Sequence, residues 1–363
     1  MKQYYDLYIG TYSEPILHGT GRVVEGKGDG IHFARFDAET GKIDIQSSVP
    51  AVNPSYLVVS EDRRFLYCVN ETKKYQGMQG GSASAYTIDA PGQLTLLNTQ
   101  STKGEDPCHT SVDRAGNCVF VANFMTGSVC MFKVKEDGSL EAASSFFQHT
   151  GSGPDTLRQT GPHAHAAVLS PNGRYLIVPD LGIDQIVVYA FDAVAGTLTP
   201  AGALQLTPGD GPRHVAFHPQ KKNLLYVINE ISLTVGVFDF NEEDGSADLI
   251  QHIEIVKAKS PDAIGADIQI TPDGRFLYAS VRDNDIIAAY QIDAQSGKLS
   301  APTIFDCGGK SPRSFAITPN GKFLVAGNQD TDNIVVFEID PNTGSLKQVF
   351  DVFAPTPVCI KFV

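Results

Sequence analysis

An aromatic residue followed by a glycine recurs seven times along this chain, and the spacing between copies limits what the chain can fold into. The aromatic residues are Phe33, Tyr86, Phe132, Tyr189, Phe238, Tyr290 and Phe337, and the glycines six to eight residues later are Gly41, Gly92, Gly138, Gly196, Gly245, Gly297 and Gly344. Successive aromatics lie 46 to 57 residues apart, which suits a four-stranded unit and is too long for a helical hairpin. The repeat predicts an all-β, seven-bladed β-propeller of four-stranded antiparallel blades, as one domain over residues 1–363.

A second marker gives the same number of units. Short apolar strands follow turns such as "SPNGRY" and "TPDGRF", and they align on Leu7, Leu66, Val119, Leu176, Leu225, Leu277 and Leu324. The N-terminal "YYDLYIGTY" has no first strand ahead of it, and the C-terminal "PTPVCIKFV" is a first strand with no blade after it. We expect the C-terminal strand to pair into the first blade, which closes the ring and removes open sheet edges.

Composition limits the partners. The formal net charge is -13 and no basic stripe is present, so a nucleic-acid surface is not expected. Neither a signal peptide nor a long apolar span is found, which predicts a soluble cytoplasmic protein with no membrane contact. The six cysteines include no CxxC pair and are expected to be buried free thiols.

Two Gly-rich stretches, residues 13–30 and 72–82, interrupt the repeat. Both are predicted to be loops between the second and third strands of a blade. The segment "GKGDG" lacks the spacing and the following helix of a phosphate-binding loop, so it is not interpreted as one.

Positions that differ between blades are the candidates for a functional site, because scaffold residues should recur in every blade. Near the start of the first strands the variable polar residues are Ser55, His109, His165, Arg213, His214, Asp267, Arg313 and Ser314. At the far end of the second strands they are Glu71, Glu230, Arg282 and Gln329. The recurring Asn70, Asn123, Asn229 and Asn328 are assigned to turn hydrogen bonds. Antiparallel pairing should bring both variable sets to one mouth of the central channel.

Such a mouth would hold a base, several acids and several fixed cations. The residues concerned are His165, Arg213, Glu230, Asp267, Arg282 and Arg313. Arginine side chains bind carboxylate or phosphate groups at two points and stabilise oxyanions, so a small anionic substrate is expected. The structural alternative is a buried salt-bridge network that only ties the blades together.

The motif "PHAHA" also raises the question of a metal site. His163 and His165 are two residues apart on an expected strand, and His109 or His214 could supply a third ligand. No specific spacing identifies further ligands. We therefore predict neither a metal nor an organic cofactor.

Longer stretches resemble a known family. The segments "GPHAHAAVLSPNGRYL", "GPRHVAFHP" with "LYVINE", "ADIQITPDGRFLYAS" and "SPRSFAITPNGKFLVAGNQ" are similar to the seven-bladed propeller 6-phosphogluconolactonases and the related fungal carboxy-muconate lactonising enzymes. The resemblance spans most of the chain and is densest over about residues 160–340. The two Gly-rich loops are not part of the family pattern.

The resemblance implies hydrolysis of 6-phospho-D-glucono-1,5-lactone to 6-phosphogluconate in the pentose phosphate pathway, with no cofactor. It places the catalytic set on His165, Arg213, Glu230 and Arg313. The remaining unshared residues are candidate substrate contacts: His109, His214, Asp267, Arg282, Glu71 and Gln329. One of His165 and Glu230 would activate water and the other would protonate the ring oxygen as it leaves, and Arg213 and Arg313 would hold the oxyanion or the phosphate. The alternatives are a muconate-type lactonising enzyme or cycloisomerase and a non-catalytic binding scaffold; a monomer or homodimer is expected.

Overall fold

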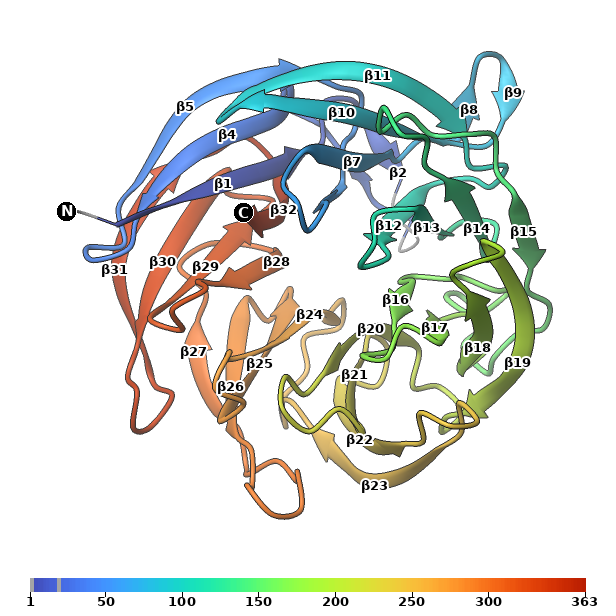
Figure 1. Ribbon diagram of the computed structural model, residues 1–363. Coiled ribbons are helices and arrows are strands. Elements are labelled where there is room, and N and C mark those ends of the chain that lie inside the picture. Colours follow the sequence, from blue (N-terminus) through green and yellow to red (C-terminus); the bar gives the residue numbers. More distant parts are fainter. Residues whose placement is uncertain (1–2, 18–20) are drawn as a thin grey trace.

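The computed structural model describes residues 3–17 and 21–363 and contains seven four-stranded antiparallel sheets arranged in a ring. Each sheet is one blade, and its four strands lie side by side in order from the central channel to the periphery (Figure 1). The predicted fold class and number of blades are therefore confirmed.

The strands fall into four sets by their distance from the channel. The innermost strands are β32 (Pro357–Phe362), β6 (Tyr56–Val59), β12 (Pro107–Val112), β16 (Val168–Leu169), β20 (Pro212–Phe217), β24 (Ile264–Ile270) and β28 (Pro312–Ile317). The second strands are β1 (Tyr4–Thr11), β7 (Phe65–Asn70), β13 (Cys118–Asn123), β17 (Tyr175–Asp180), β21 (Leu224–Asn229), β25 (Phe276–Arg282) and β29 (Phe323–Asn328).

The outer half of each blade contains the other two sets. The third strands are β4 (Gly30–Asp37), β10 (Ser82–Ala90), β14 (Ser128–Lys133), β18 (Gln185–Asp192), β22 (Thr234–Phe240), β26 (Ile286–Gln291) and β30 (Asn333–Ile339). The outermost strands are β5 (Ile43–Pro50), β11 (Gln93–Ser101), β15 (Ser145–Gln148), β19 (Thr197–Gln205), β23 (Ala247–Glu254), β27 (Thr303–Asp306) and β31 (Leu346–Phe353).

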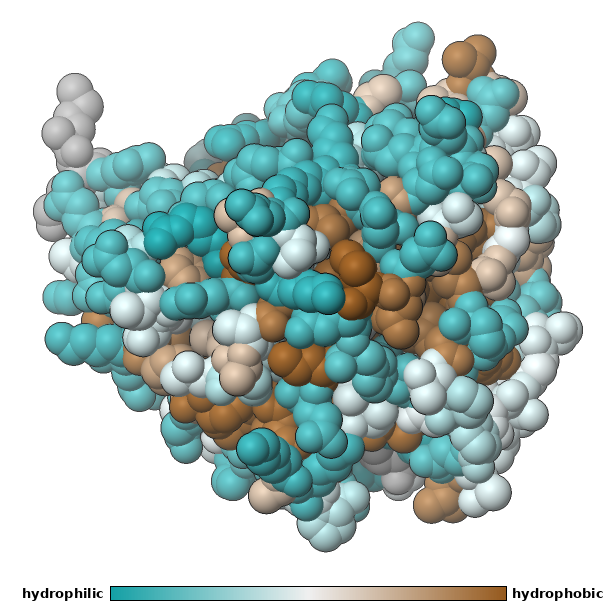
Figure 2. All heavy atoms as spheres, turned by 90° about the horizontal axis from the view of Figure 1, so that it is seen from below, coloured by the Kyte–Doolittle hydropathy of each residue, from teal (hydrophilic) through white to brown (hydrophobic). Residues whose placement is uncertain are grey.

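Burial explains why the second strands are almost continuously apolar. All six residues of β7 and of β21 are buried, because neighbouring blades cover both faces of these strands. The outermost β31 is mostly exposed, and its buried or half-buried residues alternate with exposed ones toward its end. In the side view of Figure 2 hydrophilic side chains predominate, with hydrophobic ones visible between them.

The aromatic–glycine repeat has a direct structural cause. Each aromatic lies in a third strand, and each glycine lies in the turn after it with φ between 60° and 86°, a region that L-residues with a side chain rarely adopt. A Cβ at Gly138 would lie 2.1 Å from the Phe65 ring, and one at Gly344 would lie 2.4 Å from the Phe276 ring. These turns therefore need glycine both for their conformation and for close packing between blades.

The ring closes as predicted. Strand β32 pairs antiparallel with β1, from Leu7 opposite Phe362 to Thr11 opposite Pro357. The last and first blades also share a hydrophobic core, in which the rings of Phe36 and Phe323 lie 5.6 Å apart. The first blade is thus completed by residues from the far end of the sequence.

The two Gly-rich stretches lie between second and third strands, as expected. The first forms the hairpin of β2 (Ile16–Leu17) and β3 (Val23–Val24), and the second forms that of β8 (Lys74–Tyr75) and β9 (Met78–Gln79). Both emerge at the end of the channel where the first strands begin.

Candidate active site

Bulges at the start of the first strands direct side chains into one end of the channel. Prolines 107, 212 and 312 pair with Asn123, Asn229 and Asn328, and the register then shifts by one residue. The bulged residues are Cys108, Arg213 and Arg313. A bulge re-aims a side chain at little cost to the ladder around it, so the same backbone feature presents one thiol and two guanidinium groups.

A cavity opens at this end of the channel. It is lined by Leu17, Glu71, Asp106, Cys108, Phe124, Arg158, His165, Glu230, Ile264, Arg282 and Arg313. Its empty volume, including the part that opens to solvent, is about 390 Å³. Four residues of the predicted site, Glu71, His165, Arg282 and Arg313, share this cavity with Glu230.

Glu230 is held by three guanidinium groups. Arg213 Nε lies 2.8 Å and Arg282 Nη2 lies 3.1 Å from its Oε2, and Arg158 pairs with Oε1. Burial alone would raise the pKa of Glu230, but the arginines outweigh burial and hold the pKa down to about 2. Glu230 is therefore ionised at neutral pH and suited to orienting the arginines, not to exchanging protons.

The guanidinium groups of Arg213 and Arg313 differ in how many of their N–H groups already contact the protein. The Arg213 guanidinium contacts Glu230, donates to the Ala266 carbonyl and lies 3.3 Å from His214 Nε2. Within the described residues, Arg313 makes one loose ion pair, 3.8 Å to Glu71, and packs over the Tyr12 ring at 5.4 Å. Arg313 therefore keeps N–H groups available to an incoming anion.

His165 lies between these charged groups as a neutral base. Burial, reinforced by the charges of Arg213, His214 and Arg313, holds the pKa of His165 well below its usual 6.5. Its Nδ1 lies 3.6 Å from the Cys108 sulfur, while carbonyl oxygens of Ala122, Ala164 and His165 itself lie within 3.5–3.8 Å of that sulfur. The thiol can thus donate to a carbonyl and accept from Nδ1–H, which leaves Nε2 as the basic nitrogen.

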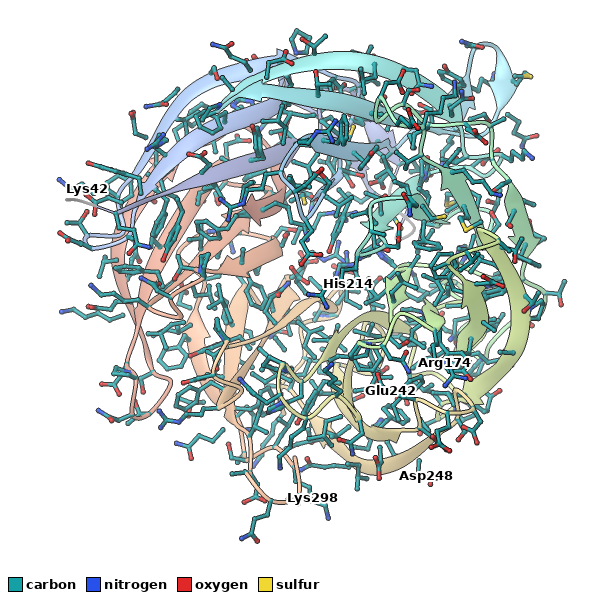
Figure 3. The ribbon with its side chains drawn as sticks, in the orientation of Figure 1. Lys42, Arg174, His214, Glu242, Asp248 and Lys298 are labelled. Carbon is teal, nitrogen blue, oxygen red and sulfur yellow. The ribbon has the colours of Figure 1, made fainter. Side chains whose placement is uncertain are left out.

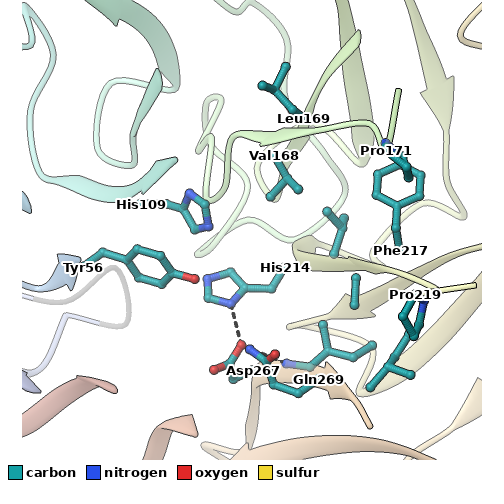
Figure 4. A pocket seen from close by; sticks show the side chains of 14 residues that line it. Tyr56, His109, Val168, Leu169, Pro171, His214, Phe217, Pro219, Asp267 and Gln269 are labelled. Atoms are coloured by element: carbon teal, nitrogen blue, oxygen red, sulfur yellow. Dashed lines mark hydrogen bonds and ion pairs between the residues drawn. The ribbon is translucent and has the colours of Figure 1, made fainter. Parts of the chain in front are cut away.

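The structure separates three predicted substrate contacts from this cavity. His109, His214 and Asp267 line a second cavity of the channel, together with Tyr56. In Figure 4 Tyr56 and His109 point toward His214, and His214 Nδ1 lies 3.0 Å from Asp267 Oδ1. His214 is close to the centre of the ring in Figure 3, whereas Lys42 and Lys298 lie at its edge.

The separation follows from strand geometry. His109, His214 and Ser314 each come directly after a bulged residue, and successive side chains of a strand point in opposite directions. Without the bulge, nothing in the sequence separates Arg213 from His214 or Arg313 from Ser314, so both members of these two pairs were expected at one site. Gln329 is also displaced: it is buried beside a neighbouring cavity that shares Arg282 and Ile264 with the first one.

Three polar residues of the cavity are not among the predicted site residues. Asp106 precedes the repeated proline, Cys108 was read as an ordinary thiol, and Arg158 belongs to a segment between β15 and β16 that has no counterpart in other blades. The wide spacing of 57 residues between Phe132 and Tyr189 was the available signal for Arg158.

The histidines of "PHAHA" do not converge. His163 Nδ1 lies 3.0 Å from the Phe124 carbonyl oxygen and its ring stacks on Phe124, while His165 turns toward Cys108. Within residues 3–17 and 21–363, no group of three His, Cys, Asp or Glu side chains is arranged to hold a metal ion. The same residues include no helix long and apolar enough to cross a membrane.

Comparisons with known proteins agree with this architecture. The family described as "Lactonase, 7-bladed beta-propeller" matches residues 6–362. A 6-phosphogluconolactonase of Bacillus subtilis is 38% identical over 98% of this chain and 97% of its own length. Another from Formosa agariphila is 35% identical over 80% of this chain and 82% of its own.

A solved structure gives the same result. The periplasmic gluconolactonase PpgL of Pseudomonas aeruginosa superposes with a TM-score of 0.90 and 31% identity over 99% of both chains. This chain belongs to the family of seven-bladed β-propeller lactonases.

Proposed function

We propose that the protein hydrolyses 6-phospho-D-glucono-1,5-lactone to 6-phosphogluconate. The observation that carries this proposal is the cavity itself, where a neutral histidine faces fixed arginines in a member of the lactonase family. The 38% identical relative over the whole chain is a 6-phosphogluconolactonase. The reaction belongs to the pentose phosphate pathway, so we place the protein in the cytoplasm, as a monomer or homodimer.

In the proposed mechanism His165 takes a proton from a water molecule as the water attacks the lactone carbonyl. General base catalysis contributes about 10² to 10⁴ in rate. Glu230 fixes Arg213 and Arg282, and their charges stabilise the oxyanion that forms in the low-dielectric cavity. Arg313 supplies further N–H groups, and no cofactor takes part in these steps.

A gluconolactonase that acts on the unphosphorylated sugar lactone is the second candidate. The solved PpgL structure favours it, as does the balance of the described cavity lining, where Glu71, Asp106 and Glu230 face Arg158, Arg282 and Arg313. A muconate-type lactonising activity would use the same arginines on a dicarboxylate.

Acid release from freshly prepared phosphorylated and unphosphorylated gluconolactone, measured against a buffer blank, separates these functions. We expect catalysis well above the blank with the phosphorylated lactone. Rates equal to the blank with both substrates would overturn lactone hydrolysis, and a preference for the unphosphorylated lactone would favour the second candidate.

Arg313→Met tests the arginine that has free bonding capacity. If Arg313 binds the phosphate, kcat/KM should fall by about 100-fold for the phosphorylated lactone only, mainly through KM. If it binds the oxyanion, kcat should fall for both lactones. Unchanged kinetics with both substrates would remove Arg313 from the site.

A further inference from the structure

Asp106 is a buried acid in the cavity that no step above uses. It precedes Pro107 at the start of β12 and is 2% exposed. Its N–H donates to the Thr72 carbonyl at 3.0 Å, and its carbonyl accepts from Phe124 N–H at 2.9 Å. Both backbone groups are satisfied, so the carboxylate is held in a fixed place at the cavity wall.

The backbone conformation at Asp106 is shared with other blades, whereas its charge is not. Asn53, Gly211, Ser311 and Thr356 also precede the proline of their first strands, and all have positive φ, as does Asp106 with 49°. The Asn53 amide oxygen accepts from Ser13 N–H and Glu14 N–H, and the Thr356 hydroxyl accepts from Lys27 N–H. Those two side chains stabilise a loop, and Asp106 is the acid among the five.

The two carboxylate oxygens of Asp106 have different surroundings. Oδ2 pairs with Lys73 Nζ, from the Gly-rich loop 72–82. Oδ1 is buried without a hydrogen-bond partner in the part of the chain that the structure describes. An unsatisfied buried acceptor destabilises the folded protein, so a bound ligand that donates to Oδ1, or a proton on it, would relieve this penalty.

The proton affinity of Asp106 contrasts with that of Glu230. Burial, and then the charge of Glu71, raises the pKa of Asp106 to about 6, although Lys73 acts in the opposite direction. Glu230, with a pKa of about 2, has no proton to give. A proton donor works best when its pKa lies near the working pH.

We propose that Asp106 is the general acid of the lactonase reaction and gives its proton to the ring oxygen as the ring opens. The proposal rests on the function proposed above. Asp106, Cys108 and His165 line one cavity, and the Cys108 sulfur lies 3.6 Å from His165 Nδ1, so a lactone bound in this cavity would lie next to both the donor and the base.

The proton balance is complete. Water adds its oxygen to the carbonyl carbon, and His165 takes the proton that water loses. The bond between the carbonyl carbon and the ring oxygen then breaks, its electron pair goes to the ring oxygen, and Asp106 protonates that oxygen. The product acid ionises to solvent, and the proton on His165 returns to Asp106. The net change is one lactone and one water converted to a hydroxy-carboxylate and one proton.

The test is the pH profile of kcat/KM for Asp106→Asn, which keeps the size of the side chain. A donor must be protonated, so wild-type kcat/KM should fall as the pH rises through about 6, the value set by Glu71, Glu105 and Lys73 around Asp106. This decrease is the alkaline limb of the pH profile. Asp106→Asn should lower kcat about 100-fold and abolish this limb. The phosphate of the substrate titrates equally for all variants.

Two further variants make the result specific. Lys73→Met removes the cation that lowers the Asp106 pKa, so the limb should move to higher pH; this variant keeps the test valid if Asp106→Asn does not fold. Asp332→Asn is the matched control, an acid paired with Lys27 outside the cavity lining, and its limb should match the wild type.

The outcomes are distinct from those of the proposed function. Wild-type hydrolysis equal to the blank overturns lactone hydrolysis and this inference with it. Wild-type hydrolysis with an unchanged limb in Asp106→Asn, whether activity is retained or uniformly reduced, overturns only the role of Asp106 as the acid. Loss of the limb in Asp106→Asn, together with its shift in Lys73→Met, supports that role.

Discussion

The channel contains two polar clusters that resemble each other in composition and differ in how their hydrogen bonds are used. One of them, the channel cluster, consists of Tyr56, His109, His214 and Asp267 in the second cavity. His214 is bound there on both ring nitrogens, by Asp267 and Arg213, and Asp267 also accepts from the N–H groups of Ile268 and Phe315. In the candidate active site, Asp106 Oδ1 and much of the Arg313 guanidinium have no partner among the described residues. Unused bonding capacity, and not polarity, distinguishes the cluster that can bind a substrate.

The pKa values of the titratable side chains also differ between the two clusters. Burial holds the pKa of His214 at about 4, with Asp267 opposing burial, and the pair is satisfied within the protein. The cavity of the candidate active site instead combines a neutral His165, an ionised Glu230 and an Asp106 with a pKa of about 6. Groups with pKa values pushed apart in one place are characteristic of acid–base catalysis.

The largest expected effect on kcat is the difference between replacing His165, in the candidate active site, and replacing His109, in the channel cluster. His165→Ala should lower kcat for the lactone by about 10³-fold, because the base is lost, while His109→Ala, in the channel, should change kcat by less than about 3-fold. Steady-state kinetics with both purified variants measures this. Comparable losses in the two variants would show that the clusters act as one site.

Glu230→Gln should have the next largest effect. It leaves Arg158, Arg213 and Arg282 around a neutral amide, so we expect a loss of about 3 kcal/mol of unfolding free energy and about 10²-fold in kcat/KM. Denaturant unfolding and kinetics measure these, with the half-exposed Glu338→Gln, 3.9 Å from Lys322, as control. Equal stability of both variants would contradict the role of Glu230 as anchor.

The same glutamate predicts a pH dependence of stability. Its pKa is lowered from 4.5 to about 2 in the folded protein, so its contribution is fully present above pH 4.5 and is lost as the pH falls toward 2. The difference in unfolding free energy between wild type and Glu230→Gln should therefore shrink over this interval. A constant difference would mean that Glu230 is not the group that titrates.

The smallest effect on catalysis is expected in the channel cluster. Asp267→Asn should cost about 1–3 kcal/mol of stability, because an amide cannot accept all the hydrogen bonds of the carboxylate, and it should leave kcat/KM within about 3-fold. Thermal unfolding and kinetics decide this. A 100-fold loss of activity would show that a change at Asp267 affects the candidate active site through the contact between His214 and Arg213.

The fold could be predicted from the sequence because every blade repeats the same solution. Seven aromatics, seven turn glycines and the unpaired terminal strands determine the ring, and the structure gives each a packing or conformational reason. The site was predicted less completely. Glu71, His165, Glu230, Arg282 and Arg313 stand out in the sequence because they differ between blades, and the structure brings them to one cavity; their roles stay predictions.

The features of the candidate site that could not be predicted from the sequence depend on the bulges and on contacts between distant loops. At a one-residue bulge Arg213 pairs with Glu230, while the next residue, His214, lines the second cavity. The composition of the segment does not indicate this bulge. Asp106 shares its position with neutral residues whose role is structural, so only its unpartnered oxygen identifies it. Arg158 reaches Glu230 from another segment, a contact that spacing cannot show.

Closure of the ring has a consequence for the order of assembly. The second strand of the first blade, β1, emerges early during synthesis, yet its inner neighbour β32 is the last strand along the chain. Until β32 arrives, β1 keeps an unpaired edge that another nascent chain can bind. The step that completes the propeller is therefore a contact between the two most distant parts of the sequence, and it should be the slowest one in folding.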